Sequence, residues 1–80
     1  MEEWKKQLRK MPYSSRQRVM AALLLLQSRD FGSLDRRQLK GYEHIYRIRI
    51  GNYRVIYFDD GARIIFRAIR RRNEATYRDF

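Results

Sequence analysis

The sequence predicts an α+β domain in which an N-terminal helical hairpin packs on a three-stranded antiparallel sheet. Apolar side chains recur at helical spacing within residues 1–28. Residues 45–69 instead alternate apolar and cationic side chains, with the period of two that a strand imposes. Two turn sequences, at residues 51–52 (Gly-Asn) and 59–61 (Asp-Asp-Gly), divide that segment into three strands. We therefore expect one domain that covers all 80 residues.

The first predicted helix runs from Glu2 to Met11 and ends at Pro12. It places Trp4, Leu8 and Met11 at the i, i+4 and i+7 positions of one helical face. That face is expected to pack on the rest of the domain.

The second helix is expected over residues 15–28, with Ser14 or Ser15 as its N-terminal cap. Its inward-facing side chains are expected to be Val19, Met20, Leu23 and Leu26. The four consecutive leucines at residues 23–26 cover more than one face of a helix. Part of this helix should therefore contact the first helix or a second chain.

The remaining elements follow from the turn residues. A polar loop is expected over residues 29–41, and Gly41 is expected to supply a turn of positive φ. The three predicted strands of the meander are Ile45–Ile50, Tyr53–Phe58 and Arg63–Ile69. Residues 70–80 form a basic tail, and no repeat, low-complexity stretch or linker interrupts the chain.

The alternation within the strands predicts an apolar and a cationic face of the sheet. In the first strand, Tyr46, Ile48 and Ile50 share one face, and Arg47 and Arg49 share the other. In the third strand, one face carries Ile65, Arg67 and Ile69, and the other face carries Ile64, Phe66 and Ala68. We expect the aliphatic side chains to point toward the helices and Arg47, Arg49 and Arg67 to face solvent. The second strand is mostly apolar on both faces, and we expect Arg54 on the cationic face.

The composition indicates a globular protein that binds a polyanion. A hydrophobic fraction of 44% and eleven aromatic residues are too high for a disordered basic tail. The formal net charge is +10, and fifteen of the nineteen basic residues are arginine. Arginine grips phosphate with two parallel hydrogen bonds and stacks on bases, whereas lysine would serve equally well for solubility alone. The alternative is a solvated charged surface without a specific partner.

Several classes of protein are excluded by what the sequence lacks. There is no cysteine, so disulfides and thiolate metal sites are excluded. The N-terminal residues do not form a signal peptide, and the longest apolar run, Val19–Leu26, is far too short to cross a membrane. No carboxylate pair, Ser/His/Asp set, metal-ligand spacing or Gly-rich phosphate loop is present. We expect a cytoplasmic protein that needs no metal or cofactor.

Four segments of the chain together carry a family pattern. They are 39–41 (Leu-Lys-Gly), 46–50 (Tyr-Arg-Ile-Arg-Ile), 51–57 (Gly-Asn-Tyr-Arg-Val-Ile-Tyr) and 71–78 (Arg-Arg-Asn-Glu-Ala-Thr-Tyr-Arg). In this order and spacing they resemble the RelE/ParE superfamily, the toxin halves of bacterial type II toxin–antitoxin pairs. The resemblance covers essentially the whole chain and implies a helical hairpin followed by antiparallel strands. Family members usually have a β-strand before the first helix, so we expect a sheet one strand smaller, a truncated start or an edge supplied by a partner.

The resemblance to RelE-like members implies an endoribonuclease that cuts mRNA on the ribosome, by attack of a ribose 2′-OH on the adjacent phosphate. The positions that match the RelE pattern are Arg47, Arg49, Arg54, Arg71 or Arg72, and Tyr77. The arginines would clamp phosphates and offset the developing negative charge. Tyr77 would stack on a base or exchange the 2′ proton. Lys40, Arg67 and Arg70 are expected to add contacts to the nucleic acid.

The reaction also needs a general base, and few residues of this chain can act as one. Arginine stays protonated at any working pH, so Tyr77 is the principal candidate, with help from His44. Each has a structural alternative: His44 as a surface or hydrogen-bonded residue, and Tyr77 as an anchor of the tail. The arginines have one as well, which is cross-strand pairing with Asp59, Glu43 and Glu74.

Two other functions within the superfamily stay open. One is ParE-like inhibition of DNA gyrase by binding alone, and the other is an inactive relative that binds RNA. Either toxin would be held by an acidic-to-amphipathic antitoxin in a hetero-oligomer. The expected contact surfaces are the exposed leucines of the second helix, the edge of the sheet and the basic groove.

Overall fold

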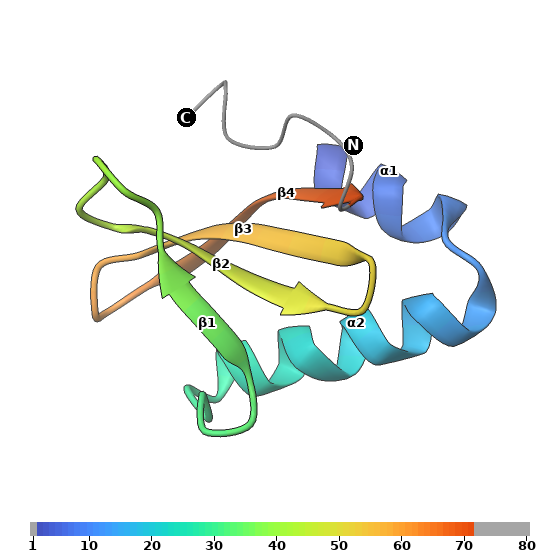
Figure 1. Cartoon of the computed structure of the whole chain (residues 1–80), viewed down its shortest axis with the longest axis horizontal. Helices are drawn as coiled ribbons and strands as arrows, with labels where there is room; N and C mark the ends of the chain where they lie inside the picture. Colours follow the sequence, from blue (N-terminus) through green and yellow to red (C-terminus); the bar gives the residue numbers. More distant parts are fainter. Residues whose placement is uncertain (1, 72–80) are drawn as a thin grey trace.

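Two helices pack on one face of a four-stranded antiparallel sheet in the computed structural model, which describes residues 2–71 (Figure 1). The elements are α1 (Glu3–Lys10), α2 (Tyr13–Gln27), β1 (Asp35–Gln38), β2 (Ile45–Ile50), β3 (Tyr53–Asp59) and β4 (Ile64–Arg71). The strands lie in the order β1-β2-β3-β4, so each pairs with the next along the chain. The predicted α+β class is confirmed, and β2 has the predicted bounds.

The sheet has one strand more than predicted, because β1 lies within the expected loop at residues 29–41. Its sequence, Asp-Arg-Arg-Gln, contains no apolar residue and therefore lacks the alternation that marks a strand. The strand exists because its backbone pairs with β2, with Arg36 opposite Ile48 and Arg37 opposite Arg47. A short, charged strand of this kind is typical of a sheet edge that must not attract further strands.

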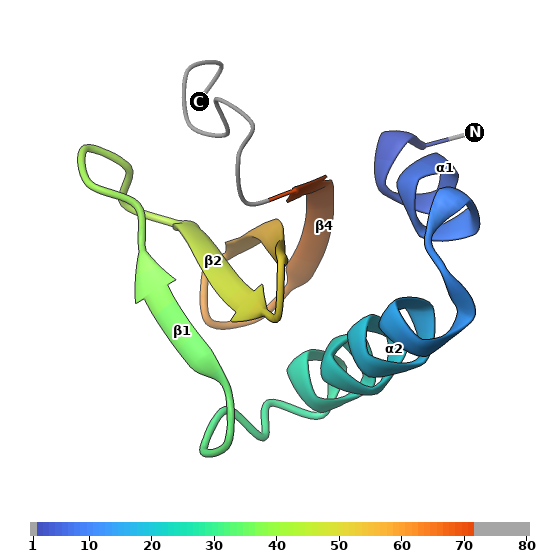
Figure 2. The same ribbon diagram turned by 45° about the vertical axis from the view of Figure 1, so that its right-hand side comes forward.

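The helices begin close to the predicted positions, but α2 is not capped by serine. Pro12 occupies its N-cap position without a side-chain hydrogen bond, and Ser14 and Ser15 lie in the first turn. Proline suits a helix start because the first amide hydrogens have no partner within the helix. α1 lies beside β4 (Figure 2), where the Trp4 and Phe66 rings meet edge to face with centroids 5.2 Å apart.

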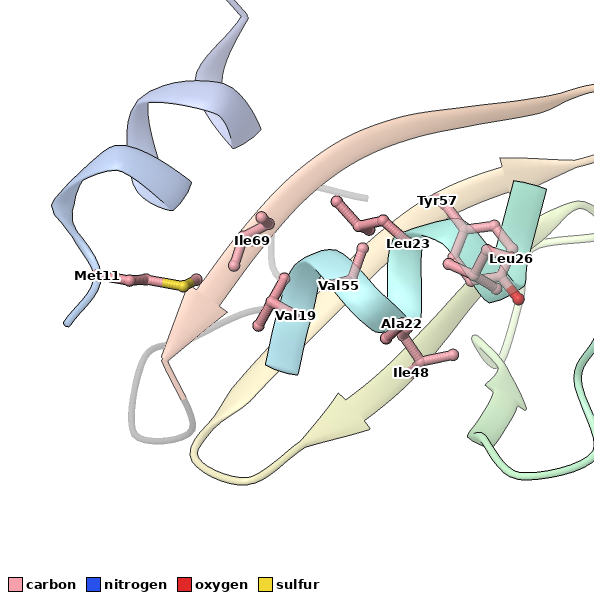
Figure 3. Close-up of a cluster of buried hydrophobic side chains, with 9 residues drawn as sticks. All are labelled: Met11, Val19, Ala22, Leu23, Leu26, Ile48, Val55, Tyr57 and Ile69. Carbon is pink, nitrogen blue, oxygen red and sulfur yellow. The ribbon is translucent and has the colours of Figure 1, made fainter. Parts of the chain in front are cut away.

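The main core lies between α2 and the helix-facing side of the sheet (Figure 3). Its buried members are Met11, Val19, Ala22, Leu23, Leu26, Ile48, Val55, Tyr57 and Ile69. Met20 was predicted to point inward but is 43% exposed, and Ala22 is buried instead. The reason is helical spacing: Ala22 continues the i, i+3, i+4, i+7 stripe that starts at Val19, whereas Met20 lies outside it.

The sheet also buries apolar side chains on the face that points away from the helices. Leu39, Ile45, Ile56 and Ala68 form this second cluster, with Tyr42 and Phe58 packed against it. The expectation that the aliphatic side chains point toward the helices is therefore wrong for these residues. The second cluster covers the half of the far face that is nearest the β1–β2 and β3–β4 turns.

A β-bulge in β4 changes the predicted faces of that strand. Ala68 pairs with Ile56 and Phe66 pairs with Tyr57, so Arg67 is the extra residue. A bulge shifts the alternation by one position. As a result Phe66 and Ile69 both pack on the helix-facing core, although simple alternation predicted opposite faces for them.

Candidate nucleic-acid interface

Three arginines from three neighbouring strands lie in one row across the sheet. Arg49 of β2 is directly opposite Arg54 of β3, and Arg54 is directly opposite Arg70 of β4. Each follows or precedes a residue of the helix-facing core, so all three side chains leave the sheet on the face away from the helices. We call these three residues the arginine row.

The geometry of the arginine row favours a bound anion. Directly opposite residues on paired strands have Cβ atoms about 4.5–5.5 Å apart, and like charges at that distance destabilise the sheet. Two such cationic pairs follow one another here. A phosphate placed over the row would offset this repulsion with charge-assisted hydrogen bonds.

A carboxylate borders the arginine row at each end. Asp35 of β1 is opposite Arg49, and Glu3 of α1 forms an ion pair with Nη1 of Arg70. The side chains of Asp35 and Glu3 are about half exposed, at 49% and 54%. The exposed Glu3 carboxylate can therefore be replaced on Arg70 by the phosphate of a ligand. Asp35 forms an ion pair with Arg47, which lies outside the row.

Arg47 is on the same face of the sheet but is not available to a ligand as predicted. Its side chain is only 11% exposed, and its Nη1 lies 3.4 Å from Oδ1 of Asp35. The same nitrogen donates a hydrogen bond of 3.1 Å to the Asp35 carbonyl oxygen. The expectation that Arg47 faces solvent is wrong, because this guanidinium ties β1 to β2.

The other predicted contact residues do not gather around the arginine row. Arg71 pairs with Tyr53 and therefore lies on the helix-facing side. Arg67 is exposed in the bulge, and Lys40 is exposed in the β1–β2 turn, at the opposite end of β2 from Arg49. Arg72 and Tyr77 lie outside the described residues, so their predicted roles stay predictions.

His44 is remote from the arginine row. Its ring meets Phe58 edge to face, with centroids 5.7 Å apart, just before β2 begins. Arg49 is five residues further along, or about 16 Å at the rise of an extended strand. The position of His44 thus favours its structural alternative over a part in proton transfer.

A second arginine cluster, which sequence reasoning missed, surrounds Asp59. Arg29 binds both carboxylate oxygens of Asp59, at 3.0 and 3.3 Å, and Nη2 of Arg36 binds Oδ2 at 3.0 Å. Nε of Arg36 also donates a 2.6 Å hydrogen bond to the hydroxyl of Tyr57. We call these four residues the Asp59 network. Cross-strand pairing with Asp59 was the structural alternative for the arginines of the meander, but the partners of Asp59 are Arg36 of β1 and Arg29, which follows α2.

Burial and ion pairing shift the pKa of Asp59 in opposite directions. Burial tends to raise the pKa of its carboxyl group, but the hydrogen bonds from Arg29 and from the Gly61 amide, with the charges of Arg29 and Arg36, lower that pKa below its ordinary value. The Arg36 guanidinium is also stacked between two rings, 4.2 Å from the centroid of Phe31 and 3.9 Å from that of Tyr46. The Asp59 network is therefore a structural ion cluster in which two guanidinium groups share one carboxylate.

Within residues 2–71, no group of three or more acidic or histidine side chains is arranged to hold a metal ion. None of the helices in this part of the chain is both long and apolar enough to span a bilayer.

Comparison with known proteins identifies the family. A family model described as the ParE toxin of the type II toxin–antitoxin system parDE matches residues 2–76. The chain belongs to this toxin family. It is thus a type II toxin of the RelE/ParE superfamily, and the predicted superfamily is confirmed.

Two known toxins are similar to this RelE/ParE toxin. Toxin RelE3 of Methanocaldococcus jannaschii is 50% identical over 36 residues, which are 45% of this chain and 41% of the relative. The match thus spans less than half the length of that curated protein. The crystal structure of a RelB–RelE antitoxin–toxin complex from Methanococcus jannaschii matches with a TM-score of 0.75 and 34% identity. That match covers 86% of this toxin and 84% of the other chain.

Proposed function

We propose that this toxin is an endoribonuclease that cuts mRNA on the ribosome and so inhibits translation. In this reaction the ribose 2′ oxygen loses its proton to a base and bonds to the adjacent phosphorus, while the bond from phosphorus to the 5′ oxygen breaks and the 5′ oxygen takes a proton from an acid. The step needs cations around the pentavalent phosphate but no metal. The observation that supports the proposal is the arginine row, which presents three neighbouring guanidinium groups on one face of the sheet.

The roles within the arginine row follow from position and exposure. Arg49 is exposed and Arg54 is half-buried beside it, so these two guanidinium groups hold the scissile phosphate. Arg70 extends the row to a neighbouring phosphate once Glu3 is displaced. No arginine can remove the 2′ proton, and this task is assigned to Tyr77 by the resemblance to RelE-like toxins.

Binding to DNA gyrase without cleavage is the second candidate function. The match to a ParE family model favours it. In that case the arginine row would contact a protein surface and no phosphate would be broken. An endoribonuclease would cut mRNA, whereas a gyrase inhibitor would cause a DNA-damage response, so an experiment can distinguish the two functions.

An antitoxin is the expected protein partner, because the structural relative is a complex of a toxin with its antitoxin. α2 carries an outward stripe of Tyr13, Met20 and Leu24, which are 70%, 43% and 66% exposed. An amphipathic segment would cover this stripe, and acidic residues in it would match the net charge of +10.

The proposed function is tested by inducing the chain in growing cells and mapping mRNA 5′ ends relative to the reading frame. The wild-type chain is expected to give cuts in register with codons, and the Arg49→Ala/Arg54→Ala variant is expected to give none. Arg63→Ala, which removes an exposed arginine from the β3–β4 turn, is the control and is expected to cut normally. A folded double variant that still cuts would refute the ribonuclease site, and a DNA-damage response without cuts would favour gyrase.

A further inference from the structure

Two cavities meet at Tyr53, on the helix-facing side of the sheet and close to the β2–β3 turn. The smaller, of about 130 Å³, is lined by Ser15, Arg18, Ile50, Gly51, Asn52 and Tyr53. The larger, of about 390 Å³, is lined by Gln7, Lys10, Met11, Pro12, Tyr53 and Arg71. The larger cavity is within the usual range for sites that bind small molecules, about 300–1,000 Å³.

Each cavity is lined by at least one cationic side chain. Lys10 comes from the end of α1, Arg18 from α2 and Arg71 from the end of β4. Among the described residues that line either cavity, none is acidic. Three cations from three elements around one aromatic ring favour an anionic ligand over a neutral one.

Gly51 allows Arg18 to lie close against the β2–β3 turn. A Cβ atom at this position would be only 3.2 Å from Nη1 of Arg18. The backbone of Gly51 also has φ of +57°, which favours glycine. The Arg18 guanidinium thus lies against the turn and lines the smaller cavity together with Asn52.

Tyr53 links the two cavities through its position in β3. It is partly buried against the main core, which fixes the ring, and it still lines both cavities. An aromatic ring flanked by arginines is the usual platform on which proteins stack a base of single-stranded nucleic acid. Asn52 lines the smaller cavity and Gln7 the larger one, and side-chain amides of this kind can hydrogen-bond to the edge of a base.

We propose that these two cavities form a nucleotide-binding subsite for single-stranded RNA, with Tyr53 stacking on a base and Arg18 and Arg71 holding the flanking phosphates. Tyr53 precedes Arg54 and Arg71 follows Arg70, so the subsite lies directly behind the arginine row. RNA that leaves the row passes around the exposed Gly51-Asn52 turn to reach it. This inference rests on the proposed function, because it extends the same RNA-binding surface to the other side of the sheet.

The test measures binding to a fluorescent 2′-O-methyl uridine dodecamer, which lacks the 2′-OH needed for cleavage. Arg18→Gln and Arg71→Gln are each expected to weaken binding about threefold to tenfold, and to reduce the salt slope of the affinity by about 0.7, as expected for one lost phosphate contact. Arg63→Gln removes the same charge at the opposite end of β3 and is the control. It is expected to change the affinity and the salt slope less than Arg18→Gln or Arg71→Gln does. Tyr53→Leu is expected to weaken binding at least about fivefold without changing the salt slope, whereas Tyr53→Phe should bind normally.

The two arginine variants decide the outcome even if Tyr53→Leu does not fold. If Arg18→Gln and Arg71→Gln both bind like Arg63→Gln, the subsite does not exist. Loss of affinity in the Arg18 and Arg71 variants alone supports it. Because the probe cannot be cut, this result is independent of mRNA cleavage by Arg49 variants, so failure of the subsite and failure of the proposed ribonuclease are distinguishable.

Discussion

The arginine row and the Asp59 network use the same side chain in opposite ways. In the network, Arg29 and Arg36 share one carboxylate that is 5% exposed, and Arg36 also binds a tyrosine hydroxyl and stacks on two rings. In the row, Arg54 is directly opposite both Arg49 and Arg70. Among the described residues, Asp35 and Glu3 border the two ends of the row.

The difference shows that the number of arginines does not identify the binding residues. A guanidinium that is compensated by a buried carboxylate stabilises the fold, because removing either partner leaves a buried charge. A guanidinium placed beside others destabilises the sheet slightly and gains most from a ligand. The two regions should therefore respond differently to the same substitution.

The largest effect is expected at the centre of the Asp59 network. Asp59→Asn leaves Arg29 and Arg36 close together without their shared carboxylate, and it should lower the free energy of unfolding by about 2–4 kcal/mol. Urea denaturation measures this difference. Asp60→Asn makes the same chemical change in the neighbouring exposed turn, where a much smaller effect is expected. Equal effects of the two variants would show that the network does not hold the fold.

A smaller loss is expected at Arg47. Arg47→Ala removes the contacts of this guanidinium with Asp35 and should destabilise the protein by about 1–2 kcal/mol. The loss should concentrate in β1, where amide hydrogen exchange should become faster than in β3. Unchanged exchange in β1 would contradict the role assigned to Arg47.

Acid should weaken the Asp59 network. The pKa of Asp59 is lowered in the folded protein, so its stabilising contribution is full above the unfolded value near 4 and is lost as pH falls through the folded pKa. Unfolding free energies measured between pH 6 and pH 2 should show this decrease. The decrease should be shallower in Asp59→Asn, and an identical pH profile would contradict the assignment.

The smallest effect on stability is expected in the arginine row. Arg49→Gln should change the free energy of unfolding by no more than about 0.5 kcal/mol, because the side chain is exposed and beside another cation. The same variant should bind RNA more weakly and lose toxicity. A destabilisation as large as that of Arg47→Ala would show that Arg49 also has a structural task.

The sequence predicted the regular part of the fold because local signals determine it. Alternation and the Gly51 and Gly61 turns were sufficient for the hairpins of β2, β3 and β4, and these glycines have positive φ as their turns require. β1 could not be predicted, since its four polar residues become a strand only through pairing with β2. The bulge at Arg67 likewise depends on tertiary packing rather than on a local signal.

The candidate site was predictable in part for the same reason. The strand period grouped Arg47 with Arg49, but it cannot distinguish an exposed arginine from a buried one such as Arg47. It did not assign Arg54, whose expected place on the cationic face agrees with its pairing opposite Arg49. Arg70 and Arg71 were both assigned to a tail, whereas pairing with β3 places them on opposite faces of the sheet. The Asp59 network joins residues that are 23 and 30 positions apart, a separation that no local pattern reports.

The salt dependence of RNA binding tests the contrast between the two arginine clusters most directly. Arg49→Gln and Arg29→Gln each remove one guanidinium, one from the arginine row and one from the Asp59 network. With a non-cleavable RNA probe, we expect the salt slope to fall by about 0.7 in Arg49→Gln and to stay at the wild-type value in Arg29→Gln. Equal slopes in the two variants would contradict the assignment of the arginine row as the phosphate-binding surface.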